Sequence, residues 1–108
     1  MMADKLYLVV RSDLSHGQQA VQACHAMTEF LVEHKDEATR WYNTSNYLAL
    51  LAVPDEYSLV RLAHKAKQRG LRLSPFHEPD RGGALTAIAL ESSAKGLLRD
   101  LKLALTGV

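Results

Sequence analysis

The chain has 108 residues, a length that suits one domain with one hydrophobic core. Hydrophobic residues make up 47% and charged residues 23%, a balance that excludes a disordered chain. The formal net charge of +1 excludes a strongly basic nucleic-acid-binding domain, so any RNA contact would need a local basic patch. We therefore expect residues 1–108 to form a single domain.

The amino terminus and the cysteine content indicate a cellular compartment. Residues 1–5 precede an apolar run of only five residues, so we expect neither a signal peptide nor a membrane-spanning segment, and no membrane partner. The single cysteine, Cys24, excludes an intrachain disulfide and is expected to pack as a small core thiol. These features predict a reducing, cytoplasmic location.

A strand followed by a long helix opens the chain. Residues 6–10 (LYLVV) form a continuous apolar run that predicts a strand covered on both faces. Ser15 is followed three residues later by Gln18, a capping-box pattern that predicts the start of a helix. The apolar periodicity continues this helix to about His34.

Uncharged polar side chains line one side of this predicted helix. At about 100° per residue, Gln18, Gln22 and His25 fall together, where a surface helix usually carries Lys and Glu. Such a row suits a half-buried cleft or interface. Two alternatives stay open, because the capping box alone accounts for Gln18 and a lone helical His25 often has a structural role.

The rest of the chain alternates between apolar runs and helical patterns. We expect strands over residues 47–53, 71–73 and 85–90, and helices opening at Pro54 and after Ser92 or Ser93. The first of these helices should end near Gly70, and the last should bury Leu97, Leu98, Leu101 and Leu105. Residues 37–46 fit either helical turns or a loop, and Pro75 favours an edge position for the third strand.

The element order β-α-β-α-β-β-α predicts an α/β fold, a three-layer α/β/α sandwich with a mixed four-stranded sheet. In such folds ligands bind beyond the carboxyl ends of strands, near the start of the following helix. This geometry gathers Arg11 and Asp13 with the start of the first helix and with the turn over residues 78–81. The five histidines are scattered without i, i+4 pairs, so no metal site is expected.

A local basic cluster lies near the end of the second predicted helix. It consists of His64, Lys65, Lys67, Arg69 and Arg72. Cations near a helix carboxyl end complement the helix dipole, which is a structural role. Contact with an RNA backbone is the alternative.

Four stretches carry a further pattern: residues 8–14 (LVVRSDL), 17–26 (GQQAVQACHA), 54–56 (PDE) and 85–89 (LTAIA). Together they resemble the type II peptidyl-tRNA hydrolase family, and the Gln-Ala-Cys-His-Ala form is most similar to its small peptidyl-tRNA hydrolase domain-containing branch. The likeness covers nearly the whole chain. It implies a homodimer that cleaves the ester between a peptide and the tRNA 3′ ribose, with peptidyl-tRNA as partner and without a metal or cofactor.

The resemblance also implies two groups of site residues. The expected catalytic residues are Glu78, His25, Gln18 and Thr86. The expected substrate-binding residues are Gln22, Arg11, Asp13 and Arg81. In this scheme Glu78, with His25, orients or deprotonates water, the glutamines and Thr86 position the ester, and an arginine meets phosphate.

Two positions depart from the family pattern. The family's usual lysine after the helix-opening glycine is Gln18 here, and the aspartate of its Asp-Ala-Gly-Arg turn is Glu78. A glutamine donates only a neutral hydrogen bond, which is weaker than that of a cation. The alternative function is therefore a non-catalytic member of the same fold that binds a tRNA end or a protein partner.

Overall fold

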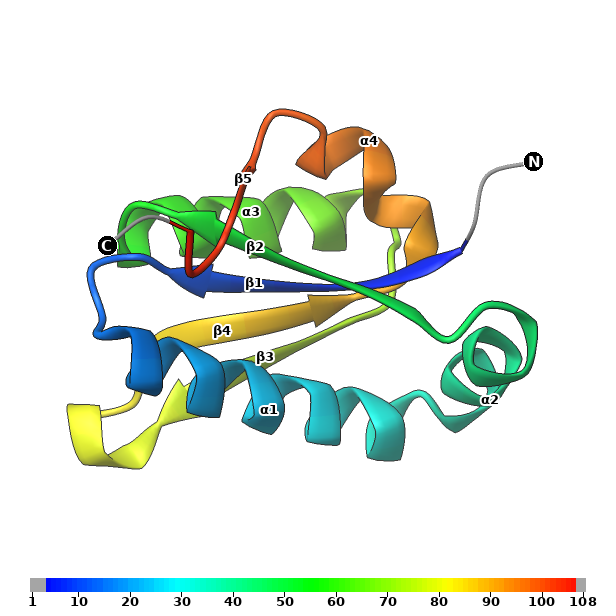
Figure 1. Ribbon diagram of the computed structural model, residues 1–108, viewed down its shortest axis with the longest axis horizontal. Helices are drawn as coiled ribbons and strands as arrows, with labels where there is room; N and C mark the ends of the chain where they lie inside the picture. Colours follow the sequence, from blue (N-terminus) through cyan, green and yellow to red (C-terminus); the bar gives the residue numbers. More distant parts are fainter. Residues whose placement is uncertain (1–3, 107–108) are drawn as a thin grey trace.

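The computed structural model, which describes residues 4–106, is built around one mixed β-sheet (Figure 1). Residues 1–3 and 107–108 of the predicted domain lie outside the described residues. The strands are β1 (Lys5–Arg11), β2 (Tyr47–Val53), β3 (Leu73–Glu78), β4 (Ala84–Leu90) and β5 (Lys102–Leu103). They are ordered β3-β4-β1-β2-β5, with β1 and β2 parallel and the other neighbouring pairs antiparallel.

Helices cover both faces of this sheet, as the alternating sequence pattern predicts. On one face lie α1 (His16–Glu33) and α2 (Lys35–Thr44), and on the other α3 (Glu56–Gln68) and α4 (Lys95–Leu98) (Figure 1). Residues 6–10 of β1 are hydrophobic because this part of the strand is buried on both faces: Leu8 and Val10 pack with the α1 core, while Val9 packs with the α3 core. The three-layer α/β/α prediction is thus confirmed.

The predicted number of strands is wrong, because the sheet has five strands rather than four. The leucine-rich end of the chain was expected to be a helix through Leu105, but α4 ends at Leu98 after a 3₁₀ turn, η2 (Ser92–Ala94). The chain then extends as β5, which pairs antiparallel with Leu51 and Ala52 of β2. Leu105 takes a left-handed φ of 59° and is exposed. Pairing with an open sheet edge overrides the helical spacing of the leucines.

Two further segments differ from their predicted forms. Residues 37–46, for which helix and loop stayed open, belong largely to the helix α2. Strand β3 starts at Leu73 rather than Leu71 and continues through Pro75 to Glu78. Its edge position is confirmed, and an edge strand tolerates a proline because one side of its backbone needs no partner.

The predicted capping box at the start of α1 is confirmed. The Ser15 hydroxyl accepts from the Gln18 N–H at 3.2 Å, and the Gln18 side-chain oxygen accepts from the Ser15 N–H at 3.2 Å. The predicted core position of Cys24 is wrong, since its side chain is exposed. The buried face of α1 includes Gln19 and Gln22, so it is rotated relative to the purely apolar stripe. Burial of two amides requires partners for them.

Candidate active site

The polar row of α1 contacts the segment formed by β3 and the following 3₁₀ turn, η1 (Pro79–Arg81). Three contacts join the two elements: Gln18 with Arg81, Gln22 with Glu78, and His25 with Phe76. Positions 18, 22 and 25 lie one above the other on a helix, so one side of α1 makes all three contacts. The sequence-based grouping of this row agrees with the geometry.

Gln22 is the central residue of this contact and is only 6% exposed. Its Oε1 accepts a hydrogen bond from the Thr86 hydroxyl at 2.5 Å. Its Nε2 donates to Glu78 Oε1 at 2.9 Å. A hydroxyl at one end of the amide and a carboxylate at the other fix its orientation, because each end meets its complementary partner. The side chain therefore joins β3 and β4 to α1.

A β-bulge in β4 places Thr86 in this network. In the pairing of β3 with β4, Phe76 opposes Ala87 and His77 opposes Leu85, which leaves Thr86 as an extra residue. Leu85 packs in the α3 core and Ala87 in the α1 core, although residues two apart in a regular strand share a face. The bulge allows the fully buried Thr86 to hydrogen-bond to α1.

Glu78 is held as an ionised acceptor. Hydrogen bonds from the Gln22 amide and from the Asp80 N–H lower the pKa of the Glu78 carboxyl, and the nearby His25 and Arg81 lower it further. Each of its two oxygens already accepts one hydrogen bond from the protein. A carboxylate retains further acceptor capacity, so Glu78 can also accept from a water or a substrate hydroxyl.

Arg81 reaches back to the start of α1. Its guanidinium donates to Gln18 Oε1 at 3.3 Å, the same oxygen that completes the capping box. The Gln18 amide nitrogen makes no hydrogen bond within residues 4–106. Gln18 therefore has a free neutral donor beside a cationic side chain.

His25 stacks on Phe76, with 4.5 Å between ring centroids and 10° between ring planes. The imidazole is exposed, while Phe76 is partly buried against the α1 core. Phe76 was not among the site residues predicted from the sequence. Its only signal was an aromatic side chain two residues before Glu78 in an otherwise polar segment.

Arg11 and Asp13 pair with each other and do not contact the Gln22 network. Two nitrogens of Arg11 donate to the Asp13 carboxylate at 3.0 and 2.9 Å, and a third donates to the Leu85 carbonyl at 3.2 Å. The hydrogen-bonded Asp13 carboxylate raises the pKa of Arg11, with a further contribution from Glu56 of α3. These two predicted substrate-binding residues thus lie toward α3 rather than beside Gln22.

The basic cluster also lies apart from the Gln22 network. Lys65 and Lys67 occupy the last turn of α3, and Arg72 pairs with Glu37 at 3.5 Å. Among the described residues, no group of three or more His, Cys, Asp or Glu side chains has a geometry that could hold a metal ion. Within the same residues, no helix has the length and hydropathy needed to cross a membrane.

Comparisons with known proteins give a family match and a shared fold. The family model described as peptidyl-tRNA hydrolase PTH2 matches residues 4–104. A search of curated proteins finds no match. Among solved structures, a protein of unknown function from Agrobacterium tumefaciens strain C58 superimposes with a TM-score of 0.68 at 14% identity, over 95% of this chain and 98% of that chain. This structural likeness shows a shared fold.

The Thr86 hydroxyl should contribute measurably to stability. In Thr86→Val the buried Gln22 Oε1 loses its donor, and we expect a loss of about 1–3 kcal/mol in the free energy of unfolding. Urea denaturation measures this loss. Thr28→Val is the matched control, because the Thr28 hydroxyl bonds a carbonyl on an exposed part of the same helix. Equal effects of the two substitutions would contradict the role of the network.

The hydrogen bonds to Glu78 also predict a pH dependence. Because the pKa of Glu78 is lower in the folded state than its ordinary value of 4.5, its ionised form stabilises the fold above that pH. This contribution is lost as the pH falls through the folded-state pKa. We expect the difference in unfolding free energy between wild type and Glu78→Gln to be constant above about pH 6 and to shrink below about pH 4.5. A difference that stays constant down to about pH 3 in urea titrations would refute this.

Proposed function

The chain belongs to the PTH2 family of peptidyl-tRNA hydrolases, and on this premise we propose that it hydrolyses the ester between a peptide and the tRNA 3′ ribose. The observation that carries the proposal is the Thr86–Gln22–Glu78 network beside the start of α1. An activated ester needs an oriented water and donors for the developing oxyanion rather than a strong nucleophile. The network supplies an anchored carboxylate for the water, and α1 supplies nearby donors.

In this mechanism Glu78 orients the attacking water. Its lowered pKa keeps the carboxylate ionised at neutral pH, so it is a strong hydrogen-bond acceptor but a weak base. Gln22 holds one oxygen of Glu78 and Thr86 holds Gln22, so the direction of the carboxylate is fixed from a buried position. Preorganisation of this kind lowers the cost of placing the water at the ester carbon.

His25 completes the proposed site as a partner of Glu78 for proton transfer. Its exposed ring stacks on Phe76 one helical turn after Gln22, near enough to the Glu78 carboxylate for the two groups to interact electrostatically. Imidazole accepts and returns protons near neutral pH. We assign to the neutral His25 imidazole the proton that leaves the attacking water, which it then returns to the leaving 3′ oxygen of the ribose. Phe76 orients the His25 ring.

Gln18 and Arg81 together replace the family's usual lysine in this proposal. The free amide nitrogen of Gln18 donates to the developing oxyanion, and the Arg81 guanidinium, 3.3 Å from Gln18 Oε1, supplies the positive charge. With the hydrogen-bond donor on Gln18 and the positive charge on Arg81, the enzyme can be active without the lysine. A cytoplasmic location, a homodimer and phosphate contact by Arg11 stay predictions.

Hydrolysis of an N-blocked aminoacyl-tRNA tests the activity. We expect wild type to release the blocked amino acid and Glu78→Gln to lower kcat/KM about 100-fold to 1000-fold, because a neutral amide orients water poorly. Glu29→Gln on α1 is the control, since Glu29 makes no hydrogen bond or ion pair among the described residues. A wild type that binds tRNA without turnover would overturn the proposal and favour the non-catalytic binder.

The role of Arg81 is tested by rescue. Arg81→Met should lower kcat/KM about tenfold or more, because the neutral Gln18 amide alone stabilises an oxyanion less well. Gln18→Lys introduced into the Arg81→Met background should restore most of this loss. The same assay with both variants measures the effect. A Gln18→Lys substitution that restores nothing would show that charge at this place is not required.

A further inference from the structure

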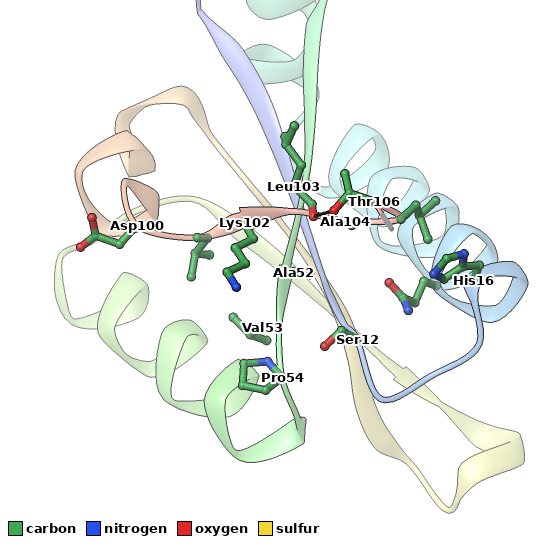
Figure 2. A pocket seen from close by; sticks show the side chains of 13 residues that line it. Ser12, His16, Ala52, Val53, Pro54, Asp100, Lys102, Leu103, Ala104 and Thr106 are labelled. Atoms are coloured by element: carbon green, nitrogen blue, oxygen red, sulfur yellow. Dashed lines mark hydrogen bonds between the residues drawn. The ribbon is translucent and has the colours of Figure 1, made fainter. Parts of the chain in front are cut away.

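A groove of about 580 Å³ lies on the other side of the α1 start, away from Glu78. Its walls come from the β1–α1 connection, the end of β2 and the carboxyl-terminal segment over residues 100–106 (Figure 2). Figure 2 shows Lys102 extending toward Val53 and Pro54, with His16 and Asp100 at opposite ends of the groove. Volumes of this size are typical of small-ligand sites.

The polar side chains around this groove lack protein partners. Within residues 4–106, no hydrogen bond or ion pair engages the Ser12 hydroxyl, the His16 ring or the Lys102 ammonium. At the Gln22 network, by contrast, the buried groups satisfy one another. Polar groups that surround one groove and remain unpaired are available to a ligand.

Gln19 gives the strongest of these signals because it is buried. Its side chain is only 2% exposed and lines the groove. Its Nε2 donates to the Leu14 carbonyl at 2.7 Å, which fixes the orientation of the amide, whereas Oε1 is a buried oxygen without any hydrogen-bond donor. A buried acceptor without a donor destabilises the protein, so a ligand that donates an N–H or O–H to Gln19 Oε1 removes this cost when it binds.

The charge around the α1 end of the groove favours an anion. The 18-residue helix α1 begins at His16, so the N–H groups of His16 and Gly17 precede its first intrahelical hydrogen bond, from Gln19 to Ser15. The first turn contains no acidic residue, and Lys102 adds a cation farther along the groove, on the side of Val53 and Pro54. A phosphate group fits these donors and the positive helix end.

We propose that this groove binds a phosphate-bearing nucleotide, specifically the 3′-terminal nucleotides of the tRNA. One phosphate meets the start of α1 and the next meets Lys102 farther along the groove, an amino or hydroxyl group donates to Gln19 Oε1, and the base lies against apolar walls. These walls are formed by Val53, Pro54, Leu103 and Ala104. The inference rests on the proposed function, because it assigns part of that substrate.

The position of the groove fits one continuous substrate. Gln19 and Gln22 are three residues apart on α1, about 4.5 Å along the helix axis, so the groove and the Gln22 network flank the same helical turn. Gly17 lies in the first turn of α1, and a Cβ there would meet no atom within 4 Å, so the space beside it is open. A nucleotide in the groove can therefore extend across Gly17 to place its ester near Gln18.

Titration of the protein with the trinucleotide CCA, followed by NMR, tests the proposal. We expect shifts in the backbone amide signals of Ser12, Gly17 and Gln19, and binding about tenfold weaker or more in Lys102→Met. Lys35→Met, at the start of α2 and beyond the carboxyl end of α1, is the matched control and should bind as wild type does. Gln19→Leu should also weaken binding, provided that its thermal unfolding shows a folded protein.

Other probes distinguish the possible occupants. Inorganic phosphate that binds as tightly as CCA, or a neutral N-acetylated amino acid amide that occupies the groove while CCA does not, would overturn the nucleotide assignment. The same holds if Lys102→Met and Lys35→Met bind CCA equally well. If hydrolysis depends on Glu78 but not on Lys102, the proposed function is supported and this inference is wrong. If the groove binds CCA but the protein does not hydrolyse the substrate, this inference is supported and the proposed function is wrong.

Discussion

The burial of the Gln22 amide is the constraint on which the site depends. A primary amide buried between a helix and a sheet is tolerated only when both of its ends find partners. Thr86 and Glu78 provide these partners from two adjacent strands. The same two hydrogen bonds therefore hold α1 on the sheet and fix the Glu78 carboxylate. The catalytic geometry that we propose is therefore maintained by the same contacts that stabilise the fold.

Much of the fold could be predicted because local and global signals agree. The apolar run of β1, the capping box at Ser15 and the edge position of β3 each have a cause within a few residues. The fifth strand could not be predicted, since its leucines fit a helix and only the exposed edge of β2 selects an extended chain. The exposure of Cys24 was not predicted for a related reason. Because α1 buries Gln19 and Gln22, its buried face is rotated away from the face that the spacing of apolar residues predicts, and Cys24 is left in solvent.

The site could be predicted in part. The row of Gln18, Gln22 and His25 was visible because helical spacing alone determines it. Their partners in β3 and η1 lie more than 50 residues away along the chain. The further contact of Gln22 with Thr86 depends on the bulge in β4, for which the sequence has no local signal. Arg11 follows the predicted strand as expected, yet its pairing with Asp13 depends on side-chain conformations that spacing does not determine.

The bulge at Thr86 has a consequence for how this fold can change over time. If Thr86 were deleted, Leu85 would directly precede Ala87. Neighbouring residues of a regular strand point to opposite faces of the sheet, so Leu85 and Ala87 would still face the two different cores. A single-codon deletion would thus remove the hydroxyl that holds Gln22 while preserving both cores. Such a deletion would keep the alternation between the two cores but would leave the buried Gln22 Oε1 without its donor, so the extra residue serves the polar network rather than the apolar packing.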